Sequence, residues 1–130
     1  MELYVESQYH RGRPYIGEYL DEVTGYWLKG DQERSRYYNH STFNDLIITG
    51  LIGLRPRLDN TIEVNPLIPA DKWEWFCVDN VLYHGHNLTI LWDKNGDRYH
   101  CGKGLRIFVN GKEAGHADTL TRLVCENALK

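Results

Sequence analysis

The sequence contains few cysteines, no long apolar run and no cluster of basic residues. Its three cysteines, Cys77, Cys101 and Cys125, are widely spaced and form no CxxC motif, so neither a disulfide framework nor a cysteine-based zinc site is expected. Reduced, buried thiols are the favoured interpretation, and one disulfide with a free third thiol is the alternative. The missing Lys/Arg cluster argues against nucleic-acid and acidic-membrane partners. No apolar run reaches the roughly 18 residues that a membrane-spanning helix needs.

Several sequence motifs of enzymes are also missing. The chain has no GxSxG nucleophile motif, no phosphate-binding P-loop and no GxGxxG dinucleotide fingerprint. Residues 1–6 lack the basic and apolar regions of a signal peptide. We therefore expect no cofactor, no membrane partner and no nucleic-acid partner.

The composition is that of an ordinary globular protein. Of the 130 residues, 42% are apolar and 25% are charged, and the formal net charge is −3. These proportions do not indicate disorder. The length alone favours a single domain.

Residues 42–54 have the pattern of a helix. Thr42 and Asp45 resemble a capping box, and Pro56 ends the helix because proline disfavours helical geometry before it. Apolar side chains occupy nearly every face: Phe43, Leu46, Ile47, Ile48, Leu51, Ile52 and Leu54. Such a helix must be buried on nearly all sides, and Gly50 and Gly53 would let a neighbouring backbone approach. Because no second strong helix is predicted, its partner would be missing helices or a second copy of the chain.

Residues 1–40 are predicted to be mostly loop with short extended pieces, whereas the pattern from residue 61 onward is β. Strands are predicted over residues 61–64, 75–83, 88–93, 97–101, 105–109 and 119–125. Asn95-Gly96 and Asn110-Gly111 are typical of hairpin turns. Short strands joined by regular turns indicate an antiparallel β-sandwich.

Two groups of residues are candidates for chemistry. Glu18 stands among aromatic residues, and partial desolvation raises the pKa of a carboxyl group into a range suited to acid–base catalysis. The spacing of residues around Glu18 alone favours a different interpretation, in which Glu18 is a solvated glutamate on a loop. Tyr38, Asn39 and His40 offer neutral donors and acceptors for sugar hydroxyls, and a local helix N-cap is an equally supported interpretation.

A histidine group is a third candidate. His84 and His86 would share one face of a strand, with His100 and Cys101 across a hairpin. No carboxylate or further ligand has the spacing of a metal motif. We therefore favour structural histidines that pack on aromatic neighbours, and we predict no metal.

Four blocks of sequence resemble a known family. They are Gly17-Glu18-Tyr19 with Thr24-Gly25, the block YNHSTFNDLI at residues 38–47, GLIGLRP at 50–56 and NPLIP at 65–69. Together they resemble the C-terminal part of (α/α)6-barrel, or six-hairpin, glycoside hydrolases. The most similar group looks like bacterial relatives of mannosylglycerate hydrolase and the processing α-glucosidases. The resemblance covers nearly the whole chain and is most specific over residues 39–69.

This resemblance implies a mainly β fold with one buried α-helix. Residues 1–57 would be the terminal segment of an incomplete catalytic barrel, ending in its last helix. Residues 58–130 would be an antiparallel C-terminal β-sandwich. The fragment would thus depend on a missing upstream barrel, or associate with itself through residues 42–54.

The resemblance also implies a mechanism. Most such enzymes invert the anomeric centre, with an acid and a base about 6.5–9.5 Å apart so that a water fits between the base and the sugar. Glu18 matches the position of the base. The sugar site would be lined by Tyr38, Asn39, His40 and Trp27. The general acid would lie upstream, so this chain alone is expected to be inactive towards its carbohydrate substrate.

A non-catalytic β-sandwich that binds carbohydrate or assembles with a partner is the rival hypothesis. Its sugar platform would consist of Trp73, Trp75, Tyr83 and Trp92. Their alternation with apolar neighbours favours positions in the core instead. Two coplanar, solvent-facing rings would favour the binding hypothesis.

Overall fold

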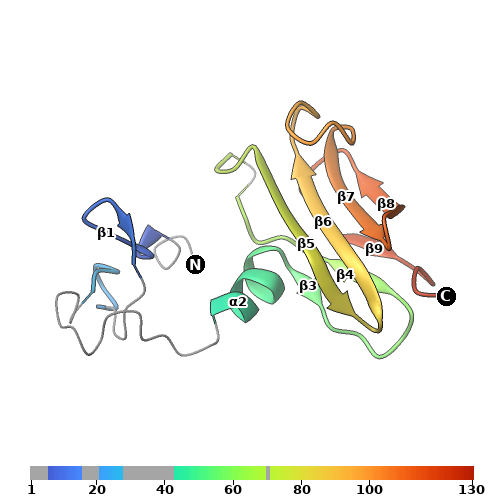
Figure 1. Cartoon of the computed structure of the whole chain (residues 1–130), viewed down its shortest axis with the longest axis horizontal. Helices are drawn as coiled ribbons and strands as arrows, with labels where there is room; N and C mark the ends of the chain where they lie inside the picture. Colours follow the sequence, from blue (N-terminus) through green and yellow to red (C-terminus); the bar gives the residue numbers. More distant parts are fainter. Residues whose placement is uncertain (1–5, 16–20, 28–42, 70) are drawn as a thin grey trace. The chain divides into compact units, whose positions relative to one another are not determined.

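The computed structural model describes residues 6–15, 21–27, 43–69 and 71–130 (Figure 1). The chain divides into two compact units, residues 1–44 and 45–130. The described residues are mainly β, as the sequence predicts, and form sheets of two, three and four antiparallel strands. No helix among them is long and apolar enough to cross a membrane.

The described part of the first unit contains one small hairpin. Strands β1 (Tyr9–His10) and β2 (Arg13–Pro14) pair antiparallel. The two residues between them, Arg11 and Gly12, both have positive φ angles, of 52° and 74°. This backbone matches the right-handed twist of paired strands.

The predicted helix is shorter than expected and mostly not α-helical. It consists of α2 (Phe43–Asp45) and the π-helix η2 (Leu46–Leu51), and the chain is already extended in β3 (Leu54–Arg55). The N–H of Ile52 donates to the carbonyl of Ile47, five residues earlier. The prediction of a helix up to residue 54 is therefore wrong.

Gly53 explains where this helix ends. Its φ of +84° is left-handed, and a Cβ there would lie 1.9 Å from the carbonyl oxygen of Asn65. The predicted close approach of a backbone at Gly53 is thus confirmed, although the approaching backbone belongs to the following strand region. The Asn65 N–H donates to the Gly53 carbonyl at 2.8 Å, which fixes the turn into β3.

Burial of the helix is also one-sided in the described chain. Leu51 and Ile52 are buried, whereas Leu46 is 40% exposed and the residues between are partly exposed. The expected burial on nearly all sides is not seen. The identity of this segment as the last helix of a barrel stays a prediction.

The second unit is built from two sheets. The three-stranded sheet has the order β3-β4-β9, with β4 at Ile62–Val64 and β9 at Leu123–Cys125. The four-stranded sheet follows chain order: β5 (Trp75–Tyr83), β6 (His86–Asp93), β7 (Gly104–Val109) and β8 (Lys112–Ala117). Most predicted strands are confirmed, although the last is shorter than residues 119–125.

The core comes from the alternating residues of these strands. Ile90 of β6 pairs with Ile107 of β7, and both are fully buried, as are Ile62 and Val64 of β4. At Gly115 of β8, an added Cβ would lie 2.5 Å from the Cys125 sulfur of β9. The two sheets therefore approach closely there, and a side chain at position 115 would require the Cys125 sulfur to move.

Tight turns join two of the three strand pairs. Asn110 and Gly111, with φ of 50° and 79°, connect β7 and β8, so that predicted hairpin is confirmed. His84 and Gly85, with φ of 50° and 80°, form an equivalent turn between β5 and β6. The predicted strand at residues 97–101 is wrong, because β6 and β7 are joined by a longer loop.

Both edge strands of this sheet carry a β-bulge. On β5 the register shifts between Val78 and Val81, where Asn80 has a φ of 57°. On β8 one extra residue interrupts the pairing opposite Ile107 and Phe108. Bulges of this kind bend a strand and increase its twist.

Candidate functional site

Four residues of the predicted sugar site lie outside the described residues: Glu18, Tyr38, Asn39 and His40. Their assignment as base and sugar-binding residues stays a prediction. The fifth, Trp27, is described and is buried.

Trp27 is anchored through its indole ring. Its Nε1–H donates to the carbonyl of Ser7 at 2.6 Å, and the Tyr15 ring meets it edge-on with centroids 5.4 Å apart. The His10 ring lies 5.2 Å from Tyr15 and 3.0 Å, by Nδ1, from the Tyr26 hydroxyl. An aromatic cluster therefore organises the described part of the first unit, and Trp27 is one of its buried members.

A tight turn leads the chain into Tyr26 and Trp27 of this cluster. The Asp21 carboxylate accepts hydrogen bonds from the N–H groups of Val23 and Thr24 at 3.0 and 2.7 Å. The Thr24 N–H and hydroxyl stabilise the ionised form and hold the pKa of Asp21 below its usual value. These hydrogen bonds close a tight turn at residues 21–25.

The histidine group does not converge. His84 stacks on Tyr83 with centroids 4.3 Å apart, whereas the Nδ1 of His86 pairs with the Asn110 side chain at 3.0 Å. No group of three or more His, Cys, Asp or Glu residues within the described ranges is placed to hold a metal ion.

The four residues of the rival sugar platform separate into two kinds. Trp92 is buried, and the hydroxyl of Tyr83 accepts the backbone N–H of Arg57 at 2.9 Å. Trp73 and Trp75 are 36% and 49% exposed. The core interpretation thus holds for Trp92, while two tryptophans remain at the surface.

These two tryptophans line a cavity of about 540 Å³, which we call the tryptophan pocket. Its walls are Lys72, Trp73, Glu74, Trp75, Phe76, Cys77 and Tyr99. The pocket lies where the start of β5 meets the loop between β6 and β7. Its volume falls within the range of about 300–1,000 Å³ that is typical of ligand-binding pockets.

The loop side of the pocket is held by one buried carboxylate. Asp93 accepts three backbone N–H groups at 2.9 Å, from Gly96, Arg98 and Tyr99. Burial raises the pKa of Asp93, but these donors outweigh it and hold the pKa below its usual value. Asp93 is therefore ionised in the folded protein at neutral pH and shapes the loop in place of the predicted hairpin.

That loop orients the Trp75 ring. The guanidinium carbon of Arg98 lies 4.4 Å from the ring centroid, and Tyr99 meets the ring edge-on at 6.4 Å and 82°. Cation–π and edge-to-face contacts of this geometry are favourable. The exposed Trp75 side chain is thus held in one orientation.

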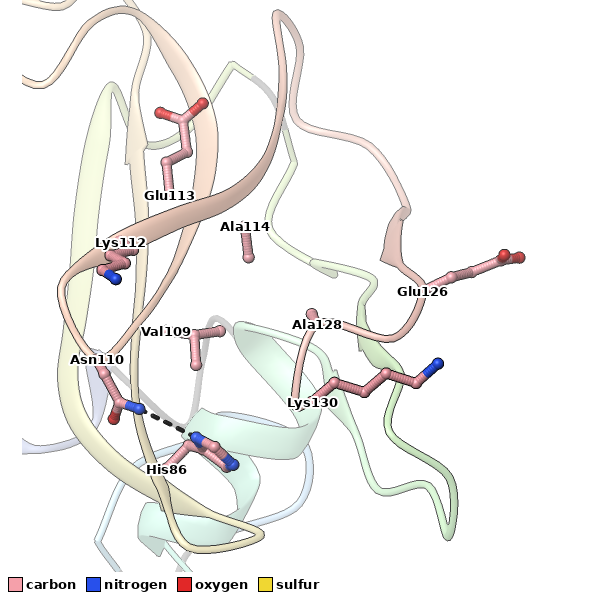
Figure 2. Close-up of a pocket in the computed structure, with 9 residues that line it drawn as sticks. All are labelled: His86, Val109, Asn110, Lys112, Glu113, Ala114, Glu126, Ala128 and Lys130. Carbon is pink, nitrogen blue, oxygen red and sulfur yellow. Dashed lines mark hydrogen bonds between the residues drawn. The ribbon is translucent and has the colours of Figure 1, made fainter.

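A second cavity, of about 340 Å³, lies between β8 and the end of the chain (Figure 2). Three small apolar side chains point into it: Val109, Ala114 and Ala128. Glu126 and Lys130 point away from it. The His86 ring is hydrogen-bonded to the Asn110 side chain. With an apolar floor and no convergent charged groups, this cavity has no arrangement suited to catalysis.

An ion-pair network covers the three-stranded sheet. Glu63 of β4 accepts hydrogen bonds from Arg122 at 2.8 Å and from Arg57 at 2.9 Å, and Arg57 also pairs with Asp59. The guanidinium of Arg122 is the main cause that holds the pKa of Glu63 below its usual value, against partial desolvation. Because every charge here is paired with an opposite one, the network is suited to stabilising the sheet.

Comparison with known proteins places this region in context. Residues 54–116 match the model of the glycosyl hydrolase family 65 C-terminal domain. This stretch runs from β3 into β8 and includes the tryptophan pocket. A solved structure named sialidase aligns with a TM-score of 0.85 and 96% sequence identity. The alignment covers 98% of this chain and 12% of that chain, so this chain spans a small part of the longer one.

The chain is therefore similar to the C-terminal region of a glycoside hydrolase, as its sequence predicts. A glycoside hydrolase-related β domain also fits interaction with carbohydrate. The narrower resemblance to mannosylglycerate hydrolase and processing α-glucosidases stays a prediction.

Proposed function

We propose that this chain acts as the C-terminal region of a larger glycoside hydrolase that cleaves glycosidic bonds with inversion. The observation that carries this proposal is the match of residues 54–116 to a glycoside hydrolase C-terminal domain. The catalytic residues would come partly from residues 1–57, as the end of the barrel, and partly from chain upstream of it.

In this proposal Glu18 is the general base. It would remove a proton from the water that attacks the anomeric carbon, while an acid from the upstream barrel protonates the leaving oxygen. Tyr38, Asn39, His40 and Trp27 would orient the sugar by hydrogen bonds and ring contacts. Because the general acid would lie in the upstream barrel, the isolated chain is expected to lack hydrolytic activity.

The direct test is substitution of Glu18 by Gln in the longer protein that contains this region. Loss of the base should lower kcat about 10²–10⁴-fold with little change in substrate binding, because the amide keeps the shape but cannot accept the proton. The substrate panel should include a sialoside, since the structural neighbour is named sialidase. The anomeric configuration of the first product, read by NMR, tests inversion.

Glu22→Gln is the matched control, because Glu22 is an exposed glutamate in the nearby turn. It should leave kcat unchanged. Full activity of the Glu18→Gln enzyme would remove Glu18 from the mechanism. Hydrolysis by the isolated 130-residue chain would refute the need for an upstream acid.

A further inference from the structure

The tryptophan pocket is built on backbone that is tied to the core. The buried Trp92 donates its indole N–H to the Trp73 carbonyl at 3.0 Å, and the Lys94 N–H donates to the Glu74 carbonyl at 2.9 Å. These two bonds fix the segment that carries Trp73 and leads into Trp75. The opposite wall is fixed by the three N–H groups on Asp93. Hydrogen bonds to the core therefore hold both walls of the pocket in place.

The two tryptophan rings that this backbone carries remain exposed to water. Trp73 and Trp75 keep 36% and 49% of their surface exposed, although each buries enough area to stabilise a core if it were turned inward. Polar and charged groups stand beside the rings, namely Lys72 and Glu74 in the wall and Arg98 on Trp75. Exposed aromatic faces bordered by hydrogen-bonding groups match the two kinds of surface on a sugar ring, its apolar C–H face and its hydroxyl edge.

We propose that the tryptophan pocket is a carbohydrate-binding site, separate from hydrolysis, which holds one or two sugar units of an oligosaccharide against Trp73 and Trp75. A continuous apolar partner surface fits this site less well, because Lys72, Glu74 and Arg98 would be desolvated beside it. The 540 Å³ volume accommodates a short oligosaccharide end. The proposal does not depend on Glu18.

The first experiment applies the fluorescently labelled 130-residue chain to an array of neutral and acidic plant, microbial and animal oligosaccharides. The oligosaccharide with the strongest signal is then titrated into the chain by calorimetry. We expect Trp75→Ala to weaken its binding about tenfold or more, and Trp75→Phe, which keeps a ring, to weaken it less. Leu82→Ala is the matched control, because Leu82 is a 74% exposed apolar residue on the same strand, and its affinity should equal that of the unmodified chain.

Circular dichroism of each variant separates loss of binding from loss of folding. If Trp75→Ala unfolds the chain, the comparison of Trp75→Phe with Leu82→Ala decides the question. An array without bound glycan would overturn the proposal, as would a bound glycan whose affinity is unchanged in a folded Trp75 variant. Neither result bears on the role of Glu18, which is measured by kcat in the longer protein.

Cys77 gives an independent readout, because its side chain lines the pocket. In a Cys101→Ser background, the bound oligosaccharide should slow the alkylation of Cys77 by iodoacetamide several-fold. Burial raises the pKa of the Cys77 thiol, so the reaction is followed at alkaline pH. An unchanged alkylation rate at saturating oligosaccharide would place the ligand elsewhere and refute the site.

Discussion

The two sheets of the second unit are organised by different kinds of contact. In the four-stranded sheet every strand pairs with its neighbour in the sequence. In the three-stranded sheet the strands have only two or three residues, and β4 pairs both with β3, the preceding strand, and with β9 from the far end of the chain. The four-stranded sheet is therefore specified by local turns and alternation, whereas the three-stranded sheet depends on close fits between single residues and on one pairing with a distant strand.

The largest difference between the sheets is expected from two glycines with similar backbone angles. Gly53→Ala should lower the free energy of unfolding by about 3–5 kcal/mol, because left-handed strain is joined by a clash with the Asn65 carbonyl. Gly111→Ala, in the Asn110-Gly111 turn, has no atom within 4 Å of its added Cβ and should cost only about 1–2 kcal/mol. Urea denaturation measures both. Equal losses would contradict the view that the three-stranded sheet depends on the close fit of Gly53 against Asn65.

An intermediate effect is expected from the loop at Asp93. Asp93→Asn should lower the free energy of unfolding by about 1–3 kcal/mol, because the amide NH₂ faces backbone N–H groups that need an acceptor. Since the pKa of Asp93 is lower in the folded than in the unfolded state, its contribution is present above the unfolded pKa of about 3.9 and is lost as the pH falls through the folded pKa.

The difference in stability between the unmodified chain and Asp93→Asn should thus become smaller in acid. Thermal melts at a series of pH values from neutral downward measure this difference. A gap that stays constant across this pH range would show that the carboxylate charge is not what holds the loop. Glu74→Gln is a suitable control, because Glu74 is an exposed carboxylate on the opposite wall.

The smallest effect is expected from the ion pairs over the three-stranded sheet. Glu63→Gln removes the charge shared by Arg57 and Arg122 and should lower Tm slightly. The loss should shrink at high salt, because the two guanidinium groups stand partly in solvent, where salt screens their attraction to Glu63. Scanning calorimetry at low and high salt measures this, with Glu126→Gln as the control. A salt-independent loss would assign the effect to packing.

The two sheets also differ in how well sequence reasoning anticipates them. The alternation in β5, β6 and β7 and the Asn110-Gly111 turn predict three strands of the meander closely, because these signals are local. The fourth strand, β8, has the sequence KEAGHA without such alternation and is not among the predicted strands. The end of the helix was missed because it depends on Gly53 meeting Asn65, a contact that periodicity does not encode. The loop at 94–103 was missed because Asn95-Gly96 looks like a tight hairpin until Asp93 is seen to collect three N–H groups.

The candidate sites likewise depend on contacts that the fold creates and that local sequence signals do not show. Tryptophans at positions 73, 75 and 92 look alike in the sequence, and only the fold separates the buried Trp92 from the exposed pair. Arg98 carries no sequence signal for a role beside Trp75, since the loop geometry brings them together. For Glu18, Tyr38, Asn39 and His40, residue types only suggest a site, and their roles in catalysis and sugar binding are implied by the resemblance.

The two bulges have a consequence for the protein in concentrated solution. An open sheet ends in strands whose unpaired N–H and C=O groups invite pairing with another molecule. Here both outermost strands, β5 and β8, carry an extra residue that breaks the regular spacing of those groups. A bulged edge is a poor template for a further strand, so the sheet resists edge-to-edge aggregation.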